Sequence, residues 1–187
     1  MTGSHITTTV IQGEVVISDN PATVLVTLLG SCISVCMFDP HARVGGMNHF
    51  LLPGEGAGED GQLAMRFGAN AMEMLINGIL KAGGNRDRLV CKTFGGGAVV
   101  PSLGRVGQDN CRFVLQYLSD EGIRCISQSL GGTQARRVRF WPTTGRAQQS
   151  LVHDVQAIGH QEEAYIRRRV EAERTWARNA GSDIELF

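Results

Sequence analysis

The sequence predicts a single domain that contains both β-strands and α-helices. Two observations lead to this class. Short runs rich in β-branched residues alternate with two longer segments of helical periodicity, and four such strands precede the first helix. The chain has 187 residues, 42% of them hydrophobic, which is enough to bury one sizeable core. We expect the domain at residues 13–150, an N-terminal tail or expression scar at 1–12, and a helical C-terminal extension at 151–187.

Four strands are expected in the first third of the chain. They cover residues 13–18, 23–29, 32–39 and 43–53. The third strand ends at Asp39-Pro40, and the fourth is broken by Gly45-Gly46 and stopped by Pro53, because proline cannot continue a strand ladder. A hairpin through residues 39–46 should place the third and fourth strands side by side.

Helices and further strands follow. In residues 62–84, apolar side chains recur at helical spacing up to a Gly83-Gly84 stop, and a second amphipathic helix ends at Gly122. Further strands are expected at residues 88–100, 123–132 and 136–145. The segment 160–179 is rich in helix formers and charge and carries a thin apolar stripe of Tyr165, Ile166, Val170 and Trp176. It reads as a solvated helix that packs one edge on the domain, in preference to a partner-binding arm.

Charge and composition exclude several classes of protein. Eighteen basic residues balance eighteen acidic ones, so no global field draws the chain onto nucleic acid or an anionic membrane. The first residues do not show the charged region followed by an apolar run that is typical of a secretory leader, and no apolar stretch comes near the ~18 residues of a membrane span, so we expect neither feature. Five cysteines, an odd number without CxxC pairs, fit reduced thiols. We therefore expect a cytoplasmic protein without membrane insertion.

Cys32 is the cysteine whose context suggests chemistry. It follows Gly30-Ser31 at a turn between two strands, where its side chain can project into solvent and neighbouring backbone N–H groups can face a bound carbonyl oxygen. Cys36, inside the next strand, reads as a small buried hydrophobe. The remaining cysteines lie in apolar periodic segments and read as structural: Cys91, Cys111 and Cys125.

His49 lies seventeen positions after Cys32, on the strand that the hairpin would place alongside. A cysteine nucleophile needs a neighbouring imidazole that holds it as thiolate and later protonates the leaving group. The two would then titrate as a pair, with the pKa of the thiol depressed by the imidazolium. The alternative is a hydrogen-bonded core histidine, which is the more frequent role of a lone histidine in an apolar strand. His41, in the turn, reads as solvated.

The sequence also contains residues typical of two other kinds of site, a zinc site and a phosphate-binding loop. Cys32, Cys36, His41 and His49 form C-x3-C-x4-H-x7-H, which has zinc-ligand types but no known finger or ribbon spacing. The triple glycine at residues 95–97 lacks a GxxxxGK[ST] or GxGxxG context for phosphate binding, so we expect it to allow close backbone approach beside a site.

Five motifs in order resemble those of one known family. They read TLLGSCISVCMFDP, VGGMNHFLLP, KTFGGGA, VGQDN and SLGGTQARRVRFWPTTG, and they span about residues 13–145. Their order and spacing are similar to those of the CheD family, the chemoreceptor glutamine deamidases of bacterial chemotaxis. The resemblance implies an α+β fold of mixed β-sheets with flanking helices, related to cysteine-based deamidase toxins.

The resemblance also implies an activity and its residues. The family converts glutamine side chains of methyl-accepting chemotaxis receptors to glutamates through a cysteine thioester, without metal or organic cofactor. Its catalytic cysteine falls on Cys32, its histidine on His49 and its third residue on Thr27, which would orient the imidazole. Thr27 also has a purely structural reading as a β-branched strand residue. Gly30 and Ser31 are assigned to the turn and the oxyanion site.

The implied partners are receptor cytoplasmic helices and, in some bacteria, the chemotaxis phosphatase CheC, which occupies the active site in the manner of a substrate helix. A second function class stays open: a non-enzymatic adaptor that binds the receptor or a phosphatase with the same surface. Cys32, His49 and Thr27 together favour the enzyme, because an adaptor needs neither a nucleophile nor a base.

Overall fold

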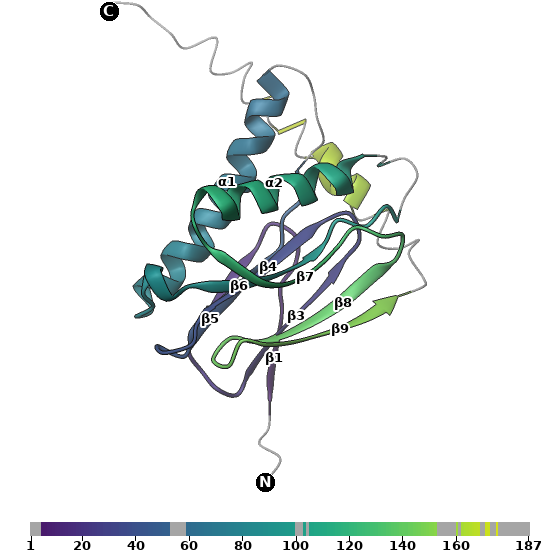
Figure 1. Cartoon of the computed structure of the whole chain (residues 1–187). Helices are drawn as coiled ribbons and strands as arrows, with labels where there is room; N and C mark the ends of the chain where they lie inside the picture. The colour runs from purple at the N-terminus through teal and green to yellow at the C-terminus, as the bar shows by residue number, and fades with distance from the viewer. Residues whose placement is uncertain are drawn as a thin grey trace, which may run out of the picture.

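The fold consists of three layers: two helices, a five-stranded sheet and a four-stranded sheet (Figure 1). The computed structural model describes residues 5–52, 59–99, 103, 105–152, 160, 162–168, 171–172 and 175. The five-stranded sheet has the order β2 (Val15–Ser18), β5 (Val44–Asn48), β4 (Ile33–Asp39), β6 (Val90–Gly95), β7 (Arg124–Leu130). The four-stranded sheet has the order β1 (Ile6–Thr9), β3 (Thr23–Leu29), β8 (Ala135–Trp141), β9 (Arg146–Val152).

Both sheets are mixed. β1 runs parallel to β3, and β6 runs parallel to β7, whereas the remaining neighbours are antiparallel. Helices α1 (Glu59–Lys81) and α2 (Val106–Asp120) cover the outer face of the five-stranded sheet, and a short 3-10 turn, η1 (Arg86–Arg88), leads into β6. The predicted α+β class with mixed sheets and flanking helices is confirmed.

The central strand β4 divides the hydrophobic core in two. All seven of its residues are buried, and alternate side chains point to opposite faces of the sheet. Ile33, Val35 and Met37 pack with the helices, while Cys36 and Phe38 pack with side chains of the four-stranded sheet. The continuous apolar run in the sequence is therefore the signature of a strand covered on both sides.

The hairpin that carries the candidate histidine is formed as predicted. β4 and β5 pair antiparallel, with Cys36 opposite Met47, and an isolated bridge joins Ile33 to Phe50 beyond the end of β5. Gly46 does not break the strand. A β-carbon there would lie 2.4 Å from the Ile17 side chain, so glycine lets β2 and α1 approach β5 closely.

Strand pairing extends beyond the range expected from the sequence. β1 lies within residues 1–12, which the sequence assigns to a tail, and its residues pair with β3 from Ile6 opposite Thr23 to Thr9 opposite Val26. β9 pairs with the whole of β8 and continues to Val152. α1 begins at Glu59, three residues before the range 62–84 in which the sequence shows helical periodicity. Pro53, Val170 and Trp176, for which the sequence makes predictions, lie outside the described residues.

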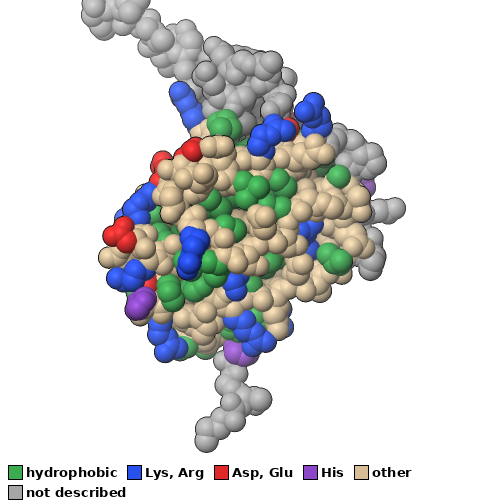
Figure 2. Space-filling model, in the orientation of Figure 1, with side chains coloured by type: hydrophobic (Ala, Val, Ile, Leu, Met, Phe, Trp, Pro, Cys, Tyr) green, Lys and Arg blue, Asp and Glu red, His purple; other side chains and the backbone are tan. Residues whose placement is uncertain are grey.

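The surface carries no concentrated charge on the face drawn in Figure 2, where Lys and Arg side chains are scattered over the molecule. This agrees with the balance of eighteen basic and eighteen acidic residues in the chain. Among the helices of the described ranges, none is both long and apolar enough to cross a bilayer.

Candidate active site

The turn at residues 30–32 connects β3 to β4 and is held from behind by the glycine loop that follows β6. The N–H of Gly97 donates to the carbonyl of Gly30 at 2.8 Å, and the N–H of Gly96 donates to the carbonyl of Cys32 at 2.7 Å. Gly95 has φ +117°, and a β-carbon on it would lie only 2.0 Å from the Cys32 carbonyl oxygen. The expectation that the triple glycine allows close backbone approach beside the site is confirmed.

Three successive backbone N–H groups of this turn converge on one carboxylate. Gly30 and Cys32 donate to Oε1 of Glu162 at 3.1 and 3.2 Å, and Ser31 donates to Oε2 at 3.0 Å. The Ser31 hydroxyl donates the fourth hydrogen bond to this carboxylate, to its Oε2 atom, at 2.5 Å. Such a concave run of N–H groups binds anions, and it can equally stabilise the oxyanion of a tetrahedral intermediate. We call it the anion nest.

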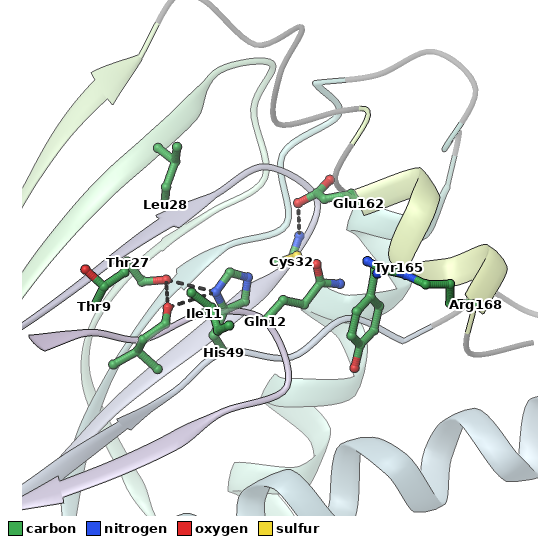
Figure 3. A pocket seen from close by; sticks show the side chains of 11 residues that line it. Thr9, Ile11, Gln12, Thr27, Leu28, Cys32, His49, Glu162, Tyr165 and Arg168 are labelled. Carbon is green, nitrogen blue, oxygen red and sulfur yellow. Dashed lines mark hydrogen bonds between the residues drawn. The ribbon is translucent and has the colours of Figure 1, made fainter. Parts of the chain in front are cut away.

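Thr27 and Val10 fix the orientation of the His49 ring. The Thr27 hydroxyl donates its only proton to the Val10 carbonyl at 2.7 Å and lies 2.8 Å from Nδ1 of His49 (Figure 3). The Val10 carbonyl is itself 3.3 Å from Nδ1. Since both neighbours of Nδ1 are acceptors, Nδ1 carries the proton. The lone pair therefore lies on Nε2.

Nε2 of His49 is buried and has no hydrogen-bond partner among the described residues. His49 is 6% exposed, and burial lowers the pKa of the imidazole to about 4. The ring is thus neutral at physiological pH. A neutral imidazole with a free lone pair can act as a general base.

Cys32 is buried rather than projecting into solvent, with 1% of its surface exposed. Burial raises the pKa of its thiol, and the neighbouring Glu162 carboxylate raises the pKa further. The expected pKa depression by an imidazolium is therefore wrong for this state of the molecule. The pair is a neutral thiol and a neutral imidazole, because both groups are desolvated and a carboxylate lies beside the thiol.

A cavity of about 460 Å³ joins these elements. Thr27, Cys32 and His49 line it together with Gln12 and with residues of the C-terminal helical segment 162–168. In Figure 3, His49 lies between Thr27 and Cys32. The structure thus brings together the candidate nucleophile, the candidate base and its orienting threonine, next to the anion nest at Gly30 and Ser31. Chemically, this arrangement can attack a carbonyl carbon and hold the resulting oxyanion.

The other candidate residues lie apart from this arrangement. Cys36 is fully buried between the sheets, and burial raises the pKa of its thiol. His41 is exposed in the hairpin turn, as expected. Across the part of the chain that the structure describes, no three His, Cys, Asp or Glu side chains lie close enough to hold a metal ion. The C-x3-C-x4-H-x7-H spacing therefore does not correspond to a cluster.

Two contributors to the site were not identified from the sequence. Glu162 enters the anion nest from a segment 130 residues away from Cys32, and only its place in a helix-forming stretch was visible. Asn48 accepts the N–H of Val35 at 2.8 Å with its side chain, where a regular ladder would continue between β4 and β5. The neighbouring His49 instead pairs its backbone with Gly13 and Glu14. In the sequence, only the position of Asn48 in an apolar strand, directly before the candidate base His49, could have indicated that its side chain has a structural part in the site.

Comparison with known proteins gives a consistent family. Residues 51–150 match the family described as "CheD chemotactic sensory transduction". A "Probable chemoreceptor glutamine deamidase CheD" of Caulobacter sp. is 49% identical over 185 residues, which cover 99% of this chain and 95% of the relative. Relatives with the same name in Cereibacter sphaeroides and Rhizobium meliloti are 55% and 49% identical, over 78% and 79% of this chain and 72% and 81% of their own lengths.

Similarity to solved structures is more distant. The crystal structure of the Bacillus licheniformis hypothetical protein YfiH matches 62% of this chain and 49% of its own chain, with 17% identity and a TM-score of 0.39.

Proposed function

The chain belongs to the CheD family, and from this premise we propose that it is a chemoreceptor glutamine deamidase that uses Cys32 as nucleophile. Its substrate is the side-chain amide of a receptor glutamine, and its products are glutamate and ammonia. The observation that carries the proposal is the arrangement around His49. Its Nδ1 is held by Thr27 at 2.8 Å, and its Nε2 is unpartnered among the described residues in a cavity shared with Cys32.

The reaction follows from this geometry in two stages. His49 accepts the thiol proton at Nε2 while the Cys32 sulfur forms a bond to the amide carbon, and the amide oxygen becomes an oxyanion in the anion nest. His49 then gives the proton to the departing nitrogen, so that the C–N bond breaks and ammonia leaves a thioester. A water molecule, deprotonated by the same Nε2, attacks the thioester carbon, and the returning proton restores the thiol.

Each neighbouring residue has a defined part. Thr27 is a positioning residue that keeps the proton on Nδ1. Gly30, Ser31 and Cys32 supply the N–H groups of the nest, and none of these steps calls for a metal or an organic cofactor. The runner-up function, a non-enzymatic adaptor, gives no reason for a neutral imidazole that is fixed in one tautomer beside a thiol.

The proposed partners follow from the substrate. Receptor glutamines of this kind lie on cytoplasmic helices, so we place the protein in the cytoplasm, without membrane insertion. CheC is a proposed partner in organisms that contain it, and it would contact the same cavity. Scattered surface charge and zero net charge favour neither nucleic acid nor an anionic membrane as a partner.

The proposal is tested by incubating the protein with a receptor cytoplasmic fragment and measuring the mass of the fragment. Replacement of an amide by an acid adds about one dalton per site when the thioester is hydrolysed. We expect this increase with the native chain and its absence with Cys32→Ala, while binding of the fragment persists. Binding without any increase in mass by the native chain would favour the adaptor.

A further inference from the structure

The anion nest is already occupied by the protein's own C-terminal helical segment, residues 162–168. Glu162 accepts four hydrogen bonds from three residues of the catalytic turn, and only 3% of it is exposed. Among the described residues, this buried carboxylate has four hydrogen-bond donors and no cationic partner. A helix that only covers an edge of the domain does not require so many hydrogen bonds to one side chain.

The group in the nest has the chemistry of the reaction product. Deamidation of a glutamine leaves a glutamate, and Glu162 places that same functional group on the N–H groups proposed to hold the amide oxygen during the reaction. Its Oε1 lies between the N–H groups of Gly30 and Cys32. This is the position that the substrate oxygen must take when the Cys32 sulfur bonds to its carbon.

The remainder of the segment lies along the same cavity. Tyr165 follows Glu162 by about one helical turn and lines the cavity (Figure 3). It packs over Gly13, where a β-carbon would be 3.3 Å from the Tyr165 hydroxyl. Tyr165 and Ile166 pack against the core cluster that contains Val10 and Cys32. The cavity therefore accepts a helix that points a side-chain carboxylate at the nucleophile and lays an apolar side chain one turn further on.

We infer that the C-terminal helical segment 162–168 is an internal product mimic: it occupies the place of the receptor helix, with Glu162 in the position of the reacted side chain, and it must leave before a receptor glutamine can enter. This inference rests on the proposed function for the identity of the displacing helix. The occupied nest itself is independent of the reaction. The electrostatics of the site agree with this inference. Burial raises the pKa of the Cys32 thiol, and the Glu162 carboxylate in the nest raises the pKa further, so the thiolate nucleophile is disfavoured while the segment is in place.

Two side chains of the same extension make a matched pair for the test. Glu162→Ala removes the carboxylate from the nest, and Glu171→Ala removes an exposed carboxylate from the same extension. The first measurement is the rate at which iodoacetamide labels Cys32, with peptide mapping to separate it from the other four of the five cysteines. The second is kcat/KM on a receptor fragment.

We expect Glu162→Ala to raise both the labelling rate and kcat/KM by about tenfold or more, as when a site occupied in roughly nine of ten molecules becomes free. Glu171→Ala should match the native chain. Equal labelling of all three proteins would overturn the inference. So would a fall in kcat/KM with Glu162→Ala, since Glu162 would then be a catalytic group.

A second variant tests the position of the side chain. Glu162→Gln puts an amide where the product carboxylate lies. The amide nitrogen cannot accept a hydrogen bond from the Ser31 N–H, so we expect it to point away from Ser31 and into the cavity. We expect the intact mass of this variant to rise by about one dalton with time as the chain deamidates itself. The same substitution combined with Cys32→Ala should keep the amide. Retention of the amide by a chain that deamidates receptors would show that position 162 is not in the place of the reacting side chain.

The two hypotheses fail in different ways. A native chain and a Glu162→Ala variant that both leave receptor fragments unchanged would reject the deamidase function, while faster labelling of Cys32 in the variant would still establish the occupied nest. Normal receptor deamidation, with labelling and kcat/KM unchanged by Glu162→Ala, would reject the internal mimic and leave the function in place.

Discussion

Thr27 Oγ1 lies 2.8 Å from Nδ1 of His49, and this contact joins the two sheets of the molecule. Thr27 belongs to β3 of the four-stranded sheet, whereas His49 directly follows β5 of the five-stranded sheet. Because the Thr27 proton is committed to Val10, the hydroxyl can only accept from the imidazole. The tautomer of the base therefore depends on how the sheets pack.

Substitution of Thr27 tests this dependence. Thr27→Val keeps the β-branched shape but removes the nearer of the two acceptors at Nδ1 and leaves only the Val10 carbonyl at 3.3 Å, so we expect kcat to fall by about tenfold or more with little change in KM. Thr27→Ser retains the hydroxyl and should restore most of kcat. Steady-state kinetics on a receptor fragment measures both. A native kcat for Thr27→Val would assign Thr27 to strand structure alone.

The low pKa of His49 predicts a pH dependence of stability. Burial lowers the pKa of His49 from 6.5 to about 4, so between these values the unfolded chain binds a proton that the folded chain does not. The folded state with a neutral His49 is therefore fully stable in this respect above pH 6.5, and the free energy of unfolding decreases as pH falls toward 4. The total decrease due to His49 is roughly 3 kcal/mol.

Urea unfolding at pH 7.5 and near pH 4.5 measures the contribution of His49 by comparison with His49→Gln, whose side chain at position 49 does not titrate, while all other titrating groups are the same. We expect the native chain to lose more free energy of unfolding between the two pH values than the variant does. Parallel losses would mean that His49 is accessible to solvent protons in the folded protein.

Two glycines with positive φ separate backbone strain from contact with the site. Gly95 has φ +117° and no room for a β-carbon beside Cys32, whereas Gly83 has φ +100° and no atom within 4 Å of that position. Gly83→Ala should lower the free energy of unfolding by about 1–2 kcal/mol and leave kcat/KM unchanged. Gly95→Ala should also displace the catalytic turn and reduce kcat/KM by about a hundredfold. If both variants kept native activity, the glycine loop would not position the turn.

Two buried cysteines should respond differently to the same truncation. Cys36 is fully buried and Cys32 nearly so, with exposures of 0% and 1%. We expect Cys36→Ala to lower the free energy of unfolding by about 1 kcal/mol and to retain kcat, whereas Cys32→Ala should abolish turnover at a similar cost in stability. Denaturation curves and turnover rates of the two variants give the comparison. Loss of turnover in a stably folded Cys36→Ala would contradict this division.

The strands of the two sheets were largely predictable because their cores are encoded locally. β4 reads as a buried strand from its own residues, and the hairpin to β5 follows from a turn between two apolar runs. β1 and β9 were not, since ITTT and RAQQSLV carry little apolar signal. These strands form because β3 and β8 offer them an open edge, which is a tertiary effect.

The candidate site also has a part that local sequence predicts and a part that depends on tertiary packing. The family motifs placed Cys32, His49 and Thr27, and the structure brings all three to one cavity. Burial of the thiol and the neutral state of the imidazole could not be read from spacing, because desolvation is set by packing from both sheets. Glu162 was out of reach for a different reason: no local pattern links a helical glutamate to a turn 130 residues away.

The hydrogen bonds behind the catalytic turn have a consequence for the electrostatics of the reaction. The carbonyl of Gly30 and the N–H of Ser31 belong to one planar peptide unit, so the bond from Gly97 to that carbonyl fixes the direction of the N–H on the other side. The dipole of this peptide unit therefore already points into the cavity before negative charge develops there. No reorganisation energy is then spent in turning it, and hydrogen bonding at its carbonyl end polarises it further. Gly97 thus influences the barrier by aligning a dipole, at a distance from the reacting atoms.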